Sequence, residues 1–240
     1  NNRPRIQETN FEGNKCLINA LGLPGIGIDQ FSIKLSHSKI WNFKRPIGIS
    51  IGGHSKEDYI ENIKTIEEKI DLRKKSYFYE LNVSCPNTVD GKTLGDNPIH
   101  LDSTIREIRK FINTPISIKV SPDSSNIILN SIGDVCRSNE QIIINAGNSQ
   151  FKTSMQVNLD PNNLSKKGGG LSGKSIFNRT LEMVKIFSVF GVPIIATGGI
   201  DNFDQIRILK KEGAILFGMA TSLILNPYCI PKINSALKNV

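Results

Sequence analysis

A thiol stands among carboxamides just after an apolar stretch of the chain. Cys85 follows residues 77–81, whose side chains are typical of a buried strand, and Asn82, Ser84 and Asn87 flank it. In α/β proteins the carboxyl ends of strands are where ligands are bound and chemistry is done. These residue types therefore indicate a nucleophile or base with amides that orient a ligand. The alternative is a structural core cysteine, but so many polar neighbours favour a polar ligand.

Glycines gather in three places in the last third of the chain. Residues 168–173 are glycine-rich, Gly198 and Gly199 follow an apolar run, and Gly218 follows the last one. Backbone N–H groups of such turns, with a helix N-terminus behind them, form a phosphate cradle. The alternative is that these glycines only close tight turns between strands and helices. Three such segments in succession favour phosphate binding.

Further polar residues are expected beside this cradle. Lys119 ends an apolar run, where its ammonium could stabilise negative charge on a reduced ring. Asn145, Asn148 and Ser149 follow the next run, and each taken alone is typical of a turn. Taken together with Asn19 and the amides near Cys85, they predict a pocket for a planar heterocycle with carbonyl, N–H and carboxylate edges.

Composition narrows the class of protein. The chain has 240 residues, 38% of them hydrophobic, which suits one domain over residues 1–240. Its four cysteines form no CxxC pair and no metal-type spacing with the three histidines, a pattern that predicts no metal and a reducing, cytoplasmic setting. The net charge of +8 lies in short, scattered clusters, which does not favour nucleic-acid binding. No apolar run reaches the roughly 18 residues of a membrane span.

Short β-type runs alternate with longer helical runs, which predicts βα units around a parallel sheet. Strands are expected at residues 46–51, 77–83, 116–120, 141–145, 193–197 and 214–217. Helices are expected at residues 56–75, 101–112, 126–137, 176–190, 202–211 and 227–238. Ser55 and Asp201 or Asn202 are candidate N-caps. Residues 1–38 are predicted to be a long irregular connection.

These six units are two fewer than a (β/α)8 TIM barrel contains. The fold class is therefore α/β, either an open doubly wound sheet or a barrel whose first two strands are absent from this sequence. The glycines after the last two strands favour the barrel, because its phosphate sites follow the seventh and eighth strands. We expect two further strand units upstream of Asn1, each of roughly 25–35 residues by the usual barrel size.

Together these motifs resemble the dihydroorotate dehydrogenases, (β/α)8 barrels that carry FMN and oxidise dihydroorotate to orotate in pyrimidine biosynthesis. The resemblance rests on residues 19–23, 82–87, 169–173 and 196–200, and it extends from about residue 3 to residue 227. It implies that Cys85 removes the C5 proton while the C6 hydride passes to N5 of the flavin. The substrate-binding residues that it implies are Asn19, Ala20, Leu21, Gly22, Leu23, Asn82, Asn87, Asn148 and Ser149. The FMN-binding residues that it implies are Ser50, Asn82, Lys119, Gly147, Gly173, Gly198, Gly199, Gly218 and Met219.

The cysteine at position 85 resembles the soluble class 1 enzymes, because the membrane-associated, quinone-reducing class has serine there. Within class 1, residues 4–9 and 91–98 are similar to the NAD-linked type, which pairs with an iron–sulfur and FAD electron-transfer subunit. Residues 23–25 are similar to the fumarate-reducing homodimer. The resemblance therefore implies a homodimer, with or without that subunit, and leaves the electron acceptor open.

Two other FMN barrels and one non-enzyme are alternatives. Dihydropyrimidine dehydrogenase has a similar cysteine, but its motif continues with His where this chain has Asn87. A tRNA dihydrouridine synthase has an Asn…Cys-Pro motif and a basic surface, but that family adds a helical RNA-binding domain. A flavin-free remnant acting as a binding module is the third alternative, and intact Cys85, Lys119 and glycine turns argue against it.

Overall fold

The computed structural model describes residues 5–84, 94–160, 162, 164 and 167–237. Its centre is a six-stranded sheet with the order β10-β9-β6-β5-β4-β3, and all its neighbouring strands are parallel. The strands are β3 (Ile47–Ile51), β4 (Tyr77–Asn82), β5 (Ile116–Val120), β6 (Ile142–Ala146), β9 (Ile194–Thr197) and β10 (Ala214–Gly218). Every one of them lies within one residue of its predicted bounds, because runs rich in Ile and Val favour the pleated conformation.

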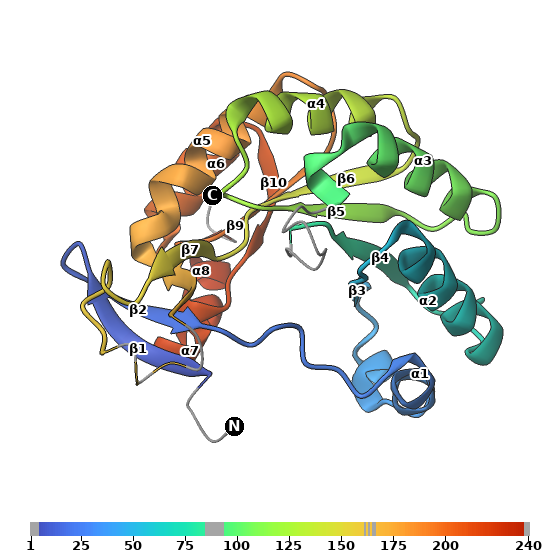
Figure 1. Ribbon diagram of the computed structural model, residues 1–240, viewed down its shortest axis with the longest axis horizontal. Helices are drawn as coiled ribbons and strands as arrows, with labels where there is room; N and C mark the ends of the chain where they lie inside the picture. The colour runs from blue at the N-terminus through green and yellow to red at the C-terminus, as the bar shows by residue number, and fades with distance from the viewer. Residues whose placement is uncertain (1–4, 85–93, 161, 163, 165–166, 238–240) are drawn as a thin grey trace.

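The sheet curves into an open half-barrel (Figure 1). Each strand pairs with the next parallel strand along the chain, so the strand order never reverses. A doubly wound sheet has such a reversal at its centre. The barrel-type prediction is therefore confirmed, and the doubly wound alternative is wrong.

Helices α2 to α6 cover the outer side of the curved sheet (Figure 1). Helix α2 begins where predicted, because Ser55 and Asp58 form a capping box in which each side chain accepts a backbone N–H of the other residue. It ends at Lys69 and not at residue 75, because Ile70 adopts an extended conformation.

The helices are α1 (Ile28–Ser36), α2 (Lys56–Lys69), α3 (Pro98–Arg109), α4 (Asn126–Arg137), α5 (Phe177–Ser188), α6 (Phe203–Lys211), α7 (Thr221–Leu225) and α8 (Cys229–Leu237), with 3-10 turns at Lys39–Phe43, Leu94–Asp96 and Lys174–Ile176. Within the described residues, none of these helices has the length and apolar character needed to cross a membrane.

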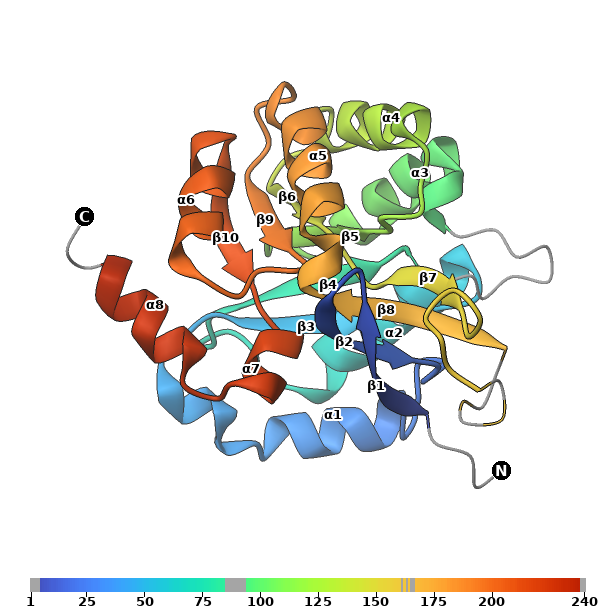
Figure 2. The ribbon, with the colours of Figure 1, turned by 90° about the vertical axis from the view of Figure 1, so that its left-hand side faces the viewer.

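A second, four-stranded antiparallel sheet lies beside helix α7 in both views (Figures 1 and 2). Its order is β1-β2-β8-β7. Two predictions are wrong here, because residues 1–38 contain two strands and helix α1, and the glycine-rich segment 168–173 is a strand and not a turn. The strands are β1 (Ile6–Phe11), β2 (Asn14–Asn19), β7 (Gln150–Thr153) and β8 (Gly168–Gly173). The sheet covers a small apolar cluster of its own, which includes Ile18 and Leu171.

The two faces of the half-barrel differ in chemistry. Alternate residues such as Tyr79, Leu81 and Ile118 are fully buried and form the main core with the outer helices. The intervening residues face the concave side, because successive side chains of a strand point to opposite faces. On β4 and β5 these include Glu80 and Lys119. The concave face is therefore the polar one, and the candidate site lies on it.

Candidate functional site

Three polar side chains form a row at the carboxyl end of the concave face. Asn82 of β4 is in register with Lys119 of β5, which is in register with Asn145 of β6. Residues paired in this way point to the same side, on strands about 4.8 Å apart. Lys119 makes no hydrogen bond or ion pair with another described residue. An ammonium therefore stands between two carboxamides and is available to a ligand.

A carboxylate lies directly below this row. Glu80 accepts a 2.7 Å hydrogen bond from Nδ2 of Asn145 and a 3.3 Å hydrogen bond from Oγ of Ser50. Two buried oxygen atoms nearby, Oδ1 of Asn145 and Oγ of Ser117, have no partner among the described residues. Such unpaired buried atoms are uncommon in native proteins and are frequent where a ligand or water completes a site.

Ser84 joins the ends of two strands above the sheet. Its hydroxyl donates to Oδ1 of Asn82 at 2.6 Å and accepts from Nδ2 of Asn148 at 2.5 Å. The carbonyl oxygen of Asn82 also accepts a 2.9 Å hydrogen bond from the Tyr59 hydroxyl. These contacts hold two amides that the sequence predicted for the site in fixed orientations.

A cavity of about 210 Å³ lies on one side of the row, and Lys119 lines it. The glycine turns after β9 and β10 form much of its wall, and the end of the antiparallel sheet forms the rest. A Cβ atom at Gly199 would lie 2.5 Å from the backbone nitrogen of Phe177, and one at Gly147 would lie 1.7 Å from the carbonyl oxygen of Thr197. Only glycine permits these close approaches. The lining of this cavity includes the predicted site residues Asn19, Asn148, Ser149, Gly173, Gly198, Gly199, Gly218 and Met219.

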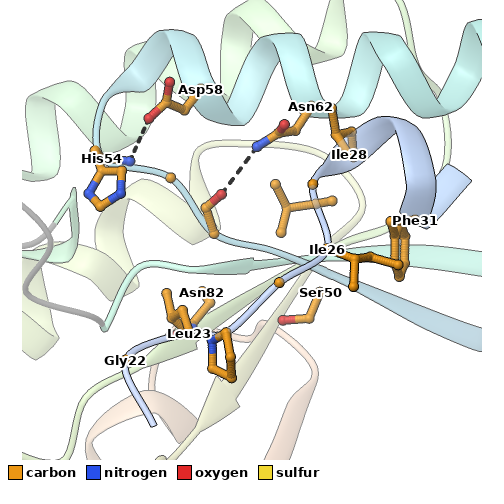
Figure 3. Close-up of a pocket in the computed structure, with 16 residues that line it drawn as sticks. Gly22, Leu23, Ile26, Ile28, Phe31, Ser50, His54, Asp58, Asn62 and Asn82 are labelled. Carbon is orange, nitrogen blue, oxygen red and sulfur yellow. Dashed lines mark hydrogen bonds between the residues drawn. The ribbon is translucent and has the colours of Figure 1, made fainter. Parts of the chain in front are cut away.

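A second cavity, of about 550 Å³, lies on the other side of the row (Figure 3). Ser50 and Asn82 line it, together with the predicted loop residues Gly22 and Leu23. Its lining residues include no Lys or Arg, and the Asp58 carboxylate in its wall accepts the backbone N–H of His54. This cavity therefore suits an uncharged part of a ligand, whereas the smaller one suits an anion.

The structure brings most of the predicted site residues to one edge of the sheet, but it does not test their roles. Cys85 and Asn87 lie outside the described residues. Ala20 and Leu21 belong to the loop between the two cavities, and the Ala20 backbone N–H donates to the carbonyl oxygen of Arg5. The Cys16, Cys136 and Cys229 thiols are buried, and burial raises the pKa of Cys136 to about 12, so that thiol is unsuited to act as a base.

Sequence reasoning assigned no site role to Glu80 and none of its own to Ser84. Both lie in the segment that first indicated the site, within or next to the strand that carries Asn82. Alternation along β4 places Glu80 on the same face as Asn82. That signal was present in the sequence, but the partners Ser50 and Asn145 come from other strands and emerge only in the fold.

A polar concave face between an anion cradle and an apolar cavity, at the carboxyl ends of parallel strands, defines a ligand-binding α/β barrel site. The family model described as dihydroorotate dehydrogenase matches residues 1–240, so the chain belongs to the dihydroorotate dehydrogenase family. A dihydroorotate dehydrogenase B (NAD(+)) catalytic subunit of Bacillus pumilus is 28% identical over 248 aligned residues, which cover all of this chain and 74% of that protein. A dihydroorotate dehydrogenase (quinone) of Nautilia profundicola is 31% identical over 91% of this chain and 60% of that protein. A crystal structure of the ligand-free enzyme from Eimeria tenella superposes with a TM-score of 0.78 at 21% identity, over all of this chain and 73% of the other, which supports the fold.

Members of this family bind FMN, and the residues present here fit that group. The Gly199 turn, which lines the cradle, packs against the backbone of Phe177 too closely to carry a side chain, and such a turn offers backbone N–H groups to a phosphate. The row beside it offers carboxamides and an ammonium to the polar edge of a flat ring. The buried, unpaired Oδ1 of Asn145 adds unfilled hydrogen-bonding capacity at the same place.

Proposed function

We propose that this chain carries out the FMN-dependent oxidation of dihydroorotate to orotate. The observation that carries the proposal is the row of Asn82, Lys119 and Asn145 beside a glycine-lined cradle. This arrangement supports a phosphorylated planar cofactor lying across the carboxyl ends of the strands. The family assignment supports FMN as the cofactor and dehydrogenation as the reaction class.

In the proposed reaction, Cys85 acts as the base that removes the proton from C5 of dihydroorotate. The hydride on C6 leaves, and a double bond forms between C5 and C6. FMN, when bound, supplies the acceptor for that hydride. In the sequence Cys85 comes directly after Ser84 and three positions after Asn82, and this closeness along the chain supports the assignment.

The remaining residues bind and orient. Asn82, Asn148 and Asn19 would hydrogen-bond the amide and carboxylate edges of the substrate, as Asn87 and Ser149 would. The loop of residues 20–23 would cover the ligand. Ser84 would hold Asn82 and Asn148 in place for this purpose. The FMN phosphate would be held by Gly198, Gly199 and Gly218 together with Gly147, Gly173 and Met219, and the ring would be held by Lys119 and Ser50.

We further propose that the chain is of the class 1, cysteine-base type. The thiol at position 85 supports this proposal, because the quinone-reducing class has serine there. The similarity to an NAD(+)-linked catalytic subunit supports the presence of a further subunit, and we propose that a homodimer of this chain passes electrons to an iron–sulfur and FAD subunit. The quinone-linked relative points to a different acceptor, so the acceptor is to be assigned by turnover with each candidate.

The decisive experiment is anaerobic mixing of the purified flavin-loaded protein with dihydroorotate while the visible absorbance is recorded. Rapid bleaching is expected, and Cys85→Ala should slow it by at least about a hundredfold, as loss of a general base does. Cys136→Ala, which removes a core thiol of α4, is the control and should bleach at the normal rate. A flavin-loaded protein that dihydroorotate does not bleach would contradict the proposal.

A further inference from the structure

Glu80 places a carboxylate beneath the site, and its hydrogen-bond donors among the described residues are not cations. It accepts hydrogen bonds from two neutral groups, the Ser50 hydroxyl and the Asn145 amide. None of the ion pairs between described residues involves Glu80. The negative charge of a carboxylate that is held by neutral donors acts on the groups near it.

The orientation of Asn145 follows from this carboxylate. A carboxylate only accepts hydrogen bonds, so the amide nitrogen of Asn145 must face Glu80 and its Oδ1 must face away. Asn145 is 7% exposed and its Oδ1 has no partner among the described residues. Glu80 therefore affects the site in two ways. It carries a negative charge, and it fixes the orientation of the Asn145 amide.

The carboxylate is close to the row that would support a ring. Its oxygen lies 2.7 Å from Asn145 Nδ2, and Asn145 stands in register with Lys119 on the adjacent strand, about 4.8 Å away. Glu80 itself precedes Asn82 by two residues on the same face of β4. The negative charge of Glu80 and the positive charge of Lys119 therefore act on the same ligand from neighbouring positions.

We propose that Glu80 lowers the reduction potential of bound FMN. This inference rests on the proposed function. The reduced ring carries more negative charge than the oxidised ring, so a nearby carboxylate destabilises the reduced form selectively. Lys119 acts in the opposite direction, and the balance of the two charges sets how readily electrons leave the flavin for the acceptor.

The test compares wild type with Glu80→Gln, which keeps the size of the side chain and removes its charge. The affinity for oxidised FMN is measured by fluorescence titration, and the midpoint potential by equilibration with reference dyes. In Glu80→Gln the affinity for reduced FMN relative to oxidised FMN should rise about tenfold, which for a two-electron couple is about +30 mV. Glu80→Asp retains the charge and should stay near wild type. Glu68→Gln, an exposed position near the cavity at the opposite end of the sheet, is the matched charge control.

A merely structural role would weaken both redox forms of FMN equally and leave the potential unchanged. An unchanged potential in Glu80→Gln, with dihydroorotate still bleaching the wild type, would overturn this inference alone. A wild-type protein that binds no FMN would overturn the proposed function and this inference together.

A second variant covers the case in which Glu80→Gln does not retain flavin. Asn145→Leu removes the amide donor and leaves the Glu80 charge less compensated, so the potential should fall. A potential that is unchanged or raised in Asn145→Leu would also overturn the inference.

Discussion

Asn148 donates a 2.5 Å hydrogen bond to the hydroxyl of Ser84, which itself donates to Asn82. One hydroxyl thus connects a residue after β6 to the last residue of β4, and 64 positions separate Ser84 from Asn148 in sequence. Both amides are proposed to contact the substrate. Their mutual orientation therefore depends on a residue that need not touch it.

Replacing Ser84 by Ala removes both hydrogen bonds, so the Asn82 amide loses its acceptor contact with the hydroxyl and Asn148 keeps only the hydrogen bond from the Ser149 backbone N–H. We expect KM for dihydroorotate to rise about tenfold, the equivalent of ~1.4 kcal/mol, which is within the usual range for two hydrogen bonds. Steady-state kinetics measures this change. Ser131→Ala, on the exposed side of α4, should leave KM unchanged. A Ser84→Ala protein with normal KM would show that the amides hold their orientation without the hydroxyl.

The cradle gives a second prediction, from a matched pair of glycines. Gly199 and Gly191 both have positive φ angles, +70° and +68°, but a Cβ would lie 2.5 Å from backbone at Gly199 and would have nothing within 4 Å at Gly191. Alanine at Gly191 should cost about 1 kcal/mol of unfolding free energy for the left-handed conformation alone. Alanine at Gly199 should cost at least ~2 kcal/mol more, because backbone must shift to accept the methyl group.

The same two alanine variants distinguish an effect on protein stability from an effect on FMN binding. Gly199→Ala should weaken FMN binding at least tenfold, because the turn that lines the cradle moves, whereas Gly191→Ala should bind FMN as the wild type does. Urea unfolding and fluorescence titration measure the two effects. Equal losses of stability in both variants would mean that the turn has room for a side chain.

The sequence predicted the six parallel strands well because each is a short run such as Ile116–Val120 that is apolar enough to be recognised alone. It failed for the antiparallel sheet. In β1 polar residues such as Glu8 and Asn10 interrupt the apolar pattern, and in β8 glycine has low strand propensity. What makes β8 a strand is its close pairing with β2, where a Cβ at Gly169 would lie 2.2 Å from the carbonyl oxygen of Asn19, and such a contact between distant segments has no local signal.

The sequence likewise predicted some residues of the candidate site and missed the contacts of others. Lys119, Asn82 and Asn148 could be predicted because each polar residue interrupts or ends an apolar run. Glu80 also interrupts its run, but its role depends on Ser50 and Asn145, which become its neighbours only when the four strands β3 to β6 pair. Residue type and position therefore indicate where chemistry occurs, whereas the fold decides which groups act on one another.

Asp123 supplies a prediction on pH. Its carboxylate accepts the backbone N–H of Phe151 and so ties the loop after β5 to β7. Burial raises the pKa of Asp123 above its ordinary value, partly offset by that hydrogen bond. A raised pKa means that the folded protein binds this proton more tightly than the unfolded chain does. The stability that this group contributes is then present below the unfolded pKa of 3.8 and is lost as pH rises through the folded value.

Asp123→Asn should therefore stabilise the protein at pH 7 by a few tenths of a kcal/mol, since Asp123 is an exposed residue and solvent screens its carboxyl. The gain should disappear below pH 3.8, where the carboxyl is protonated in both states. Urea unfolding of both proteins across this pH range measures the difference. A variant that is less stable than wild type at pH 7 would show that the charged form strengthens the hydrogen bond to Phe151 by more than its burial costs.

Arg179 supplies the last prediction, because its guanidinium fastens the loop that follows β5. It donates to the carbonyl oxygen of Pro122 at 2.9 Å and to that of Ser124 at 2.6 Å. A lysine ammonium cannot occupy both positions in the plane of the guanidinium fork. Arg179→Lys should therefore lower the unfolding free energy by about 1–3 kcal/mol.

The loop held by Arg179 begins directly after the strand that carries Lys119, so loosening it should also reduce FMN affinity. Arg137→Lys is the control, because that arginine is exposed and pairs with Asp134 one turn away on the same helix. Such surface pairs contribute between zero and about 1 kcal/mol, and lysine retains the charge. If Arg179→Lys and Arg137→Lys unfold at the same urea concentration, the loop is held by its own turn and not by the guanidinium. If Arg179→Lys is less stable but binds FMN normally, the position of Lys119 is set by β5 alone.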